Sequence, residues 1–252
     1  MIEITDLKKE YTLNGRKKYA LDGISVKIPE GCFVSVIGPS GAGKSTLLRS
    51  INGMISVDGG KVEINGKNIS SLKGKEKREV QKNICMIFQD FCLVESSTVI
   101  KNVLNACLAD MNLFSAVFGI FGTERKAKAA EILERVGMAE KINQPADSLS
   151  GGEQQRTAIA RAIMQGGNIL LADEPVASLD PANAEDVLEL MKSLQKEKNI
   201  TVIMNSHNLE QAVKYSDWII GLNSGRIIYE GKPENLTAEI KEDIYRRDNS
   251  NG

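Results

Sequence analysis

Apolar and polar positions in the first part of the chain follow the periods of β-strands. Apolar residues alternate with polar ones at Ile2 and Ile4 and again over residues 24–28, which predicts two half-buried strands. Residues 9–15 end in a turn-forming Asn-Gly pair, and we expect a loop there. Residues 32–37 form a continuous apolar-rich run, which is typical of a strand buried in a parallel sheet.

A helix, a hairpin and a charged helix are predicted next. Residues 44–51 are expected to be helical, and residues 62–64 to begin a short strand. That strand ends at Asn65-Gly66, a pair that favours a β-hairpin. Residues 74–83 are rich in Lys, Arg and Glu, which is more typical of a solvated helix face than of a binding patch. Residues 84–88 form an apolar run of β type.

The middle of the chain has the periodicity of helices. Residues 98–108 and 124–136 place apolar positions at helical spacing, and Gly137 is expected to end the second helix. Between them, residues 113–121 are apolar but too few to span a membrane. We expect this stretch to form the core of a small helical unit. The alternative is an apolar surface that docks a partner.

Helices and strands alternate in the last hundred residues. A helix is expected from residue 151, and a frayed tail over residues 248–252. Such alternation predicts a mainly parallel sheet with helices on its faces. The elements expected in between are strand 169–172, helix 181–196, strand 200–204, a further helix, strand 218–222, strand 225–229 and helix 238–247.

Composition narrows the class of protein. The 252 residues suffice for one large α/β domain with an appendage or for two small domains, and 42% are hydrophobic. The net charge of −1 argues against nucleic acid as the main partner, because proteins that bind it usually carry a basic surplus. We find no apolar run long enough to cross a bilayer and no signal-peptide pattern at the N-terminus, so we expect a cytoplasmic protein.

Residues 38–45 fit the pattern of a phosphate-binding P-loop: glycine, four residues, then Gly-Lys-Ser. Glycines in this loop allow a tight backbone turn with N–H groups aimed at phosphate oxygens. Lys44 can reach the β- and γ-phosphates, and the Ser45 hydroxyl can bind Mg²⁺. The buried strand before the loop and the helix after it are the setting that this chemistry needs.

Two acidic residues follow an apolar strand further along the chain. Asp173 lies at the carboxyl end of residues 169–172, where an acid beside a P-loop can hold Mg²⁺ directly or through water. Glu174 is one position further and faces a different direction, so it is a candidate for polarising the attacking water.

Ser150-Gly151-Gly152-Glu153 precedes a predicted helix and allows two interpretations. Ser150 and Glu153 have the spacing of a helix capping box, which explains the segment structurally. The serine hydroxyl and two unshielded glycine amides can also bind an anion at the helix N-terminus. Because a cap does not need two glycines, we favour phosphate binding.

Three further residues are candidates because of their position. His207 is the only histidine and follows a predicted strand at the carboxyl side of the sheet, so a structural and a catalytic role are equally open. Gln89 follows another strand, and its side-chain amide could contact Mg²⁺ or water. Asp180 and Pro181 have the pattern of an N-cap followed by a first-turn proline.

Together these segments resemble the ATP-binding cassette (ABC) ATPases along nearly the whole chain. The resemblance implies a P-loop NTPase fold of the α/β class. It would have a mainly parallel sheet core, an antiparallel β subdomain and a small helical subdomain. The family motifs fall at residues 38–45 (Walker A), Gln89 (Q-loop), 149–155 (signature), Asp173 and Glu174 (Walker B), 178–180 (D-loop) and His207 (switch histidine). Glu153 departs from the family, where Gln is commoner.

The resemblance also implies domain limits. Residues 1–247 would be a single ABC ATPase domain with a tail at 248–252. Residues 1–89 and 150–247 would form the RecA-like core with its N-terminal β subdomain, and residues 90–149 the helical subdomain.

The resemblance assigns site residues in the same way. ATP and Mg²⁺ are the implied cofactors, and Glu174, His207 and Lys44 the implied catalytic residues. Ser45, Gln89 and Asp173 would hold the metal. Nucleotide would contact Tyr11, Gly38, Pro39, Ser40, Gly41, Ala42, Gly43, Lys44, Ser45, Thr46, Gln89, Ser150, Gly151 and Gly152. Tyr11 takes the place of the aromatic ring that stacks on adenine. Two copies would pair head to tail.

A narrower resemblance is to the ATPase subunits of phosphonate importers. It rests on residues 48–53, 87–94, 102–104, 113–121, 172–181 and 219–222. That subfamily often has Gly-Arg where this chain has Ala106-Cys107. The resemblance implies membrane permease partners and an indirect partner in an extracytoplasmic solute-binding protein. The chain would sit at the cytoplasmic face of the membrane. The alternatives are an importer of another small polar solute, such as an amino acid, and a soluble ABC ATPase that does not act in transport.

Overall fold

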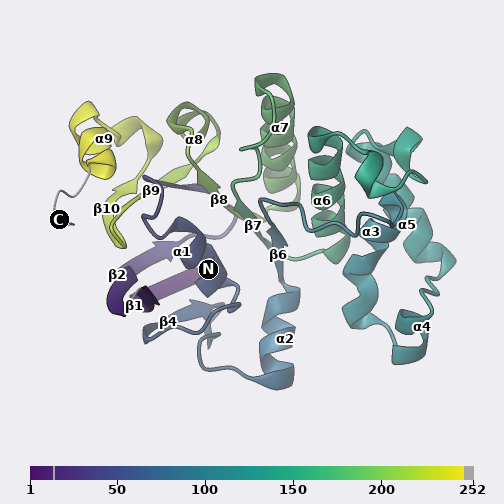
Figure 1. The fold of residues 1–252 in the computed structure, drawn as a ribbon, viewed down its shortest axis with the longest axis horizontal. Coiled ribbons are helices and arrows are strands. Elements are labelled where there is room, and N and C mark those ends of the chain that lie inside the picture. The colour runs from purple at the N-terminus through teal and green to yellow at the C-terminus, as the bar shows by residue number, and fades with distance from the viewer. Residues whose placement is uncertain (14, 247–252) are drawn as a thin grey trace.

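The computed structural model describes residues 1–13 and 15–246, and its centre is a six-stranded, mainly parallel sheet (Figure 1). The strand order is β10-β9-β3-β8-β7-β6, and only the outer pair β9 and β10 is antiparallel. The strands are β3 (Phe33–Ile37), β6 (Ile84–Ile87), β7 (Ile169–Asp173), β8 (Thr201–Ser206), β9 (Trp218–Asn223) and β10 (Arg226–Gly231). The mainly parallel core predicted from the alternation of helices and strands is confirmed.

A second sheet is antiparallel and comes almost entirely from the N-terminal part of the chain. Its order is β2-β1-β4-β5, with β1 (Ile2–Leu13), β2 (Arg16–Ile28), β4 (Gly59–Ile64) and β5 (Lys67–Asn68). The hairpin between β4 and β5 turns at Asn65 and Gly66, which both have positive φ, as the sequence predicted. Figure 1 shows α1 between this sheet and the central one.

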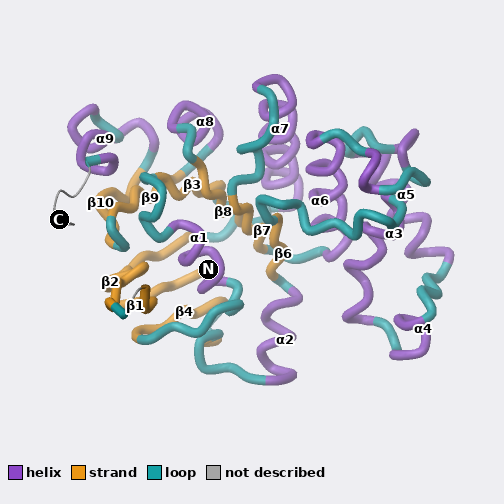
Figure 2. Tube along the Cα trace, viewed as in Figure 1, coloured by secondary structure: helices purple, strands orange, loops and turns teal. Residues whose placement is uncertain are grey.

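Helices cover the central sheet and extend it at one end. Figure 2 shows α3, α4, α5 and α6 gathered at the end of the molecule opposite β10. The α-helices are α1 (Lys44–Ile51), α2 (Gly74–Lys82), α3 (Val99–Leu104), α4 (Leu113–Val117), α5 (Thr123–Arg135), α6 (Gly151–Gln165), α7 (Pro181–Lys198), α8 (Leu209–Tyr215) and α9 (Ala238–Tyr245). Short 3₁₀ helices are η1 (Asn105–Asp110), η2 (Ala139–Lys141), η3 (Ala146–Ser148) and η4 (Pro233–Asn235). No helix in the described part of the chain is long and apolar enough to cross a membrane.

The central strands are mostly apolar because both of their faces are buried. On β3, Phe33 packs into a cluster with α6 and α7, whereas Val34 and Val36 pack into a second cluster with α1 and the antiparallel sheet. Successive side chains of a strand point to opposite faces, so a strand covered on both faces is apolar at most positions. This explains why residues 32–37 form an unbroken apolar-rich run.

The loop expected over residues 9–15 is wrong for the part that the structure describes. β1 continues to Leu13 and pairs with β2, so Lys9, Glu10 and Tyr11 are strand residues. Tyr11 pairs directly with Lys18. The ladder extends beyond the buried part of the sheet, where polar side chains occupy both faces and the apolar alternation disappears. Asn14 lies outside the described residues, whereas Gly15 has the positive φ of a turn.

The core predicted over residues 113–121 is also wrong. Only Phe121 is buried there, and Leu113 (81% exposed), Phe114, Val117, Phe118 and Ile120 are exposed. We call these five side chains the α4 apolar surface. The core of the helical region is instead supplied by α3, α5 and α6, through residues such as Val103, Leu133 and Ile159. The exposure of these side chains agrees with the alternative interpretation, an apolar surface.

Candidate functional site

The loop between β3 and α1 has the backbone that its glycines predict. Gly38, Gly41 and Gly43 all have positive φ. A Cβ on Gly43 would lie 2.3 Å from the Ala20 carbonyl oxygen, and one on Gly38 would lie 2.1 Å from that of Leu222. Larger residues are therefore excluded at both positions by close backbone contacts as well as by φ. The loop delivers Lys44 to the first turn of α1.

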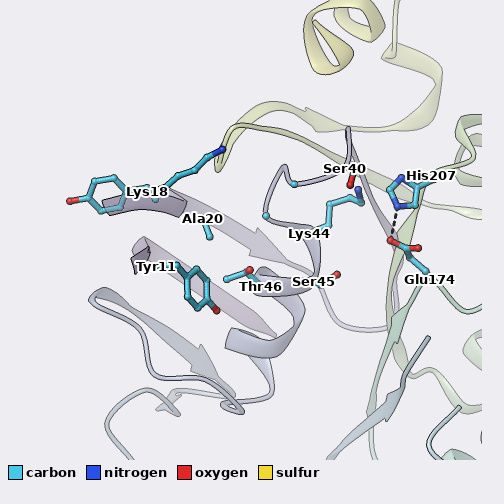
Figure 3. A pocket seen from close by; sticks show the side chains of 12 residues that line it. Tyr11, Lys18, Ala20, Ser40, Lys44, Ser45, Thr46, Glu174 and His207 are labelled. Carbon is cyan, nitrogen blue, oxygen red and sulfur yellow. Dashed lines mark hydrogen bonds and ion pairs between the residues drawn. The ribbon is translucent and has the colours of Figure 1, made fainter. Parts of the chain in front are cut away.

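A cavity of about 370 Å³ opens beside this loop (Figure 3). It lies between the P-loop, the β1–β2 hairpin and the carboxyl ends of β7 and β8. Its lining residues are Tyr11, Lys18, Tyr19, Ala20, Ser40, Gly41, Gly43, Lys44, Ser45, Thr46, Glu174 and His207. The cavity therefore combines aromatic rings, a glycine-rich backbone loop and two candidate catalytic side chains.

Lys44 is buried and held by backbone oxygens. Its Nζ donates to the carbonyl oxygens of Gly38 at 2.9 Å and Pro39 at 3.1 Å. Burial lowers the pKa of Lys44, and the nearby carboxylates of Glu174 and Asp173 oppose that shift. An ammonium group that is poorly solvated and already oriented is suited to an anionic ligand, because it gains more from such a ligand than an exposed lysine does.

Asp173 and Ser45 come together as the sequence predicted. The Ser45 hydroxyl donates to Asp173 Oδ1 at 2.8 Å, and Arg49 lies 3.7 Å from Asp173 Oδ2. A hydroxyl and a carboxylate are oxygen ligands of the kind that Mg²⁺ takes at nucleotide sites, where it binds one or two carboxylates together with substrate phosphates. The residues present therefore fit a magnesium ion.

Glu174 and His207 form a pair at the edge of the cavity. His207 Nε2 lies 2.5 Å from Glu174 Oε1, as the dashed line in Figure 3 marks. Glu174 has a φ of 54°, which is uncommon for a residue with a Cβ. Strain of this kind at the end of a strand is typical of functional positions. Two residues 33 apart in sequence thus share one hydrogen bond at the site.

Ser150, Gly151 and Gly152 lie outside the residues that line the cavity. They begin α6, where the capping box is present: Ser150 N–H donates to Glu153 Oε2 at 2.8 Å and the Ser150 hydroxyl accepts from the Glu153 N–H. The backbone hydrogen bond from Ser150 lowers the pKa of Glu153. Ser150 and Gly151 are exposed, so this helix terminus is accessible from solvent.

Gln89 is exposed after β6 and does not line the cavity. The loop that follows it is strained at Phe91 and Cys92, which both have positive φ. Arg161 of α6 holds that loop by donating to the carbonyl oxygens of Cys92 at 2.5 Å and Phe91 at 2.7 Å. The Gln89 loop is therefore tied to the same helix that Ser150 begins.

The helix cap predicted at Asp180 is present and lies outside the cavity. Asp180 accepts a hydrogen bond from the Asn183 N–H at 3.1 Å, with Pro181 in the first turn of α7. Sequence reasoning missed Lys18, Tyr19 and Ala20 as cavity residues. The Asn-Gly pair after β1 was the available signal, because a hairpin there brings β2 alongside Tyr11.

The profile of the ABC transporter family matches residues 21–177, more than half of the chain. This chain belongs to the ABC transporter family. Its fold and its P-loop site are those of an ABC-type ATPase, an enzyme that couples ATP hydrolysis to transport.

Curated relatives match over almost the full length. One is the phosphonates import ATP-binding protein PhnC of Lactococcus lactis subsp. cremoris. It is 43% identical over 98% of this chain and 100% of its own length. The protein of the same name from Lactobacillus gasseri is 45% identical over 99% of this chain and 94% of its own.

Solved structures of ABC cassettes share the fold of this ABC protein. The ATP-binding cassette MJ0796, in a dimeric post-hydrolysis state bound to ADP and phosphate, has a TM-score of 0.82 and 33% identity. The match covers 92% of this chain and 99% of that one. CbiO1 of Clostridium perfringens, part of an ABC transporter complex, has a TM-score of 0.80 and 29% identity over 94% of this chain and 90% of its own.

Proposed function

We propose that this chain is the ATP-hydrolysing subunit of an importer for phosphonates. The observation that carries the proposal is the similarity to phosphonates import ATP-binding proteins, which reaches 43–45% identity and extends through the helical region as well as the P-loop core. The second candidate is an importer of another small polar solute, because the ATPase does not touch the cargo. A soluble ABC ATPase without a transport role is the third.

The cavity is proposed as the ATP site. The adenine ring stacks on Tyr11, and the phosphates lie along Gly38–Thr46, where backbone N–H groups and Lys44 bind them. Ser45, Asp173 and Gln89 would hold Mg²⁺, and the ion would supply positive charge to the phosphates. Ser45 lines the cavity, and its hydrogen bond to Asp173 holds the two groups side by side.

Hydrolysis is assigned to Glu174, His207 and Lys44. Phosphoryl transfer depends mainly on positioning and on stabilising charge. Glu174 orients and polarises the attacking water, and its bond to His207 Nε2 fixes the direction of the carboxylate. His207 contacts the γ-phosphate, and Lys44 contributes positive charge to the same phosphate.

A second copy of the chain is proposed to complete the site. Ser150, Gly151 and Gly152 stand at an accessible helix N-terminus away from the cavity, so they reach a phosphate only if it belongs to another molecule. In a head-to-tail pair, each ATP lies between the P-loop of one copy and Ser150 of the other. ATP then stabilises the pair, and hydrolysis releases it.

The helical region is proposed to connect the ATPase to its permease at the cytoplasmic face of the membrane. Residues 90–149 form this helical subdomain. The proposed core with its β subdomain is residues 1–89 and 150–247, of which the structure describes 1–13, 15–89 and 150–246. The α4 apolar surface is the proposed permease contact, since exposed apolar patches mark interaction sites. The solute-binding protein acts indirectly, through the permease.

ATP hydrolysis in a reconstituted transporter tests the cargo. The chain is combined in vesicles with its co-purifying permease and binding protein, and turnover is compared with a small phosphonate, an amino acid or buffer. Stimulation by the phosphonate alone is expected. Stimulation by the amino acid alone would retain the import function but reject the cargo, and failure to recover a membrane partner would favour the soluble alternative.

A further inference from the structure

Asn205 is a buried polar residue next to the P-loop site that the proposed function leaves without a role. It lies near the carboxyl end of β8, between β3 and β7, and is fully buried. The parallel register pairs it directly with Asp173 on β7. Its side-chain amide is buried inside the sheet, and a buried amide is costly unless it finds a hydrogen-bond partner.

That partner is the Asp173 carboxylate. Asn205 Nδ2 donates to Asp173 Oδ1 at 2.7 Å, and the Ser45 hydroxyl donates to the same oxygen at 2.8 Å. Because an ionised carboxylate only accepts hydrogen bonds, the amide of Asn205 must present its nitrogen and not its oxygen. The orientation of the amide is therefore fixed by the charge of Asp173.

The other end of the same amide is unsatisfied. Asn205 Oδ1 is buried and has no hydrogen-bond partner among the described residues. A buried acceptor without a partner destabilises the folded state, so an apolar residue would serve packing better. The contact with Asp173 accordingly distinguishes Asn205 from a residue that only fills the core.

We propose that Asn205 is a positioning residue that holds the Asp173 carboxylate for Mg²⁺ bound with ATP. The proposal rests on the metal role that the proposed function gives Asp173. Of the two described donors to Asp173 Oδ1, Ser45 is itself a proposed metal ligand, whereas Asn205 is buried behind the carboxylate. Asn205 would thus keep Asp173 in one orientation while Ser45 coordinates the metal. Groups that orient ligands in this way commonly change metal affinity by about tenfold or more.

Nucleotide binding with and without metal tests this assignment. The dissociation constant of ATP is measured for the whole protein in EDTA and in Mg²⁺. The Asn205→Ala variant is expected to bind metal-free ATP within about twofold of wild type but to lose about tenfold of the gain that Mg²⁺ provides. Asn205→Val, which leaves less of a cavity and has no hydrogen-bond donor, is expected to show the same selective loss and covers the case in which Asn205→Ala folds poorly.

Thr201→Val is the matched control. Thr201 is also buried on β8, but it lies at the opposite end of the strand, where its hydroxyl accepts from the Gly31 N–H at 3.0 Å. It should change the thermal midpoint without changing the gain from Mg²⁺. A full Mg²⁺ gain in both folded Asn205 variants would overturn the inference.

Asp173→Asn separates this inference from the proposed function. If Asp173→Asn also keeps the full Mg²⁺ gain, the metal role of Asp173 is wrong and the inference falls with it. If Asp173→Asn loses the gain while the Asn205 variants keep it, the metal role stands and only the positioning role of Asn205 is rejected.

Discussion

At the scale of residues, short-range backbone chemistry decides where the reactive groups point. Glycines at 38 and 43 are required by carbonyl oxygens that a Cβ would strike, and Glu174 adopts a left-handed φ that turns it toward His207. These features follow from a few neighbouring positions each. Neighbouring residues alone therefore sufficed to predict where the P-loop, the acidic pair and the serine cap of α6 lie in the fold.

The proposed contact between Tyr11 and adenine can be tested by substitution. Replacing the Tyr11 ring with Ala removes the proposed adenine stack and should raise the ATP dissociation constant by roughly tenfold, because stacking on one base is worth about 1–3 kcal/mol. Titration calorimetry with ATP measures the effect. Tyr11→Phe should bind like wild type, since the ring and not the hydroxyl is proposed to act.

Tyr19→Ala is the control for Tyr11, because Tyr19 lines the same cavity and is 49% exposed. It should change ATP affinity much less. An equal loss in both alanine variants, or a loss in Tyr11→Phe as large as in Tyr11→Ala, would contradict the stack.

At the scale of elements, the limits of sequence reasoning have physical causes. The strand over residues 9–12 was missed because its sequence, Lys-Glu-Tyr-Thr, lacks the alternation of apolar and polar residues that marks a buried face. Lys18 and Tyr19 were then missed as cavity residues. Residues 113–121 were assigned to a core because the hydrophobicity of a segment does not reveal whether a neighbouring element covers that segment.

The proposed permease contact of the α4 apolar surface can be tested by substitution. Changing Phe114 and Phe118 to Ser should leave thermal stability and basal ATP hydrolysis nearly unchanged. Both rings are exposed, 67% and 65%, and mainly contact each other, with centroids 4.7 Å apart. Binding to membrane vesicles that contain the permease should fall about tenfold, as expected for aromatic side chains at the centre of an interface.

Ile228→Ser is the matched change on β10, at another exposed apolar side chain, and should bind those vesicles normally. The permease contact is rejected if the double variant binds as tightly as wild type. It is also rejected if wild type binds equally well to vesicles that lack the permease, because the surface would then contact lipid.

At the scale of the whole molecule, the site is divided between two places. The cavity gathers the P-loop, Glu174 and His207, whereas Ser150 begins α6 outside it. The order of motifs along the chain predicted both parts of the site. The fold places the P-loop cavity and the start of α6 apart, so the two parts do not meet within one chain. The central claim is therefore that a second copy supplies the missing half of each ATP site.

The molecular mass of the Glu174→Gln variant with ATP tests this claim most directly. Glutamine keeps the shape but is a poor base, so the variant should bind ATP, lose turnover and change from monomer to dimer in light scattering. Adding Gly151→Asp should restore the monomer, since it places a carboxylate against the partner's phosphate. The added Cβ lies no closer than 3.5 Å to a neighbour, and an acid is tolerated at a helix N-terminus, so folding should persist. A Glu174→Gln protein that stays monomeric with saturating ATP, or a double variant that still dimerises, would contradict the shared site.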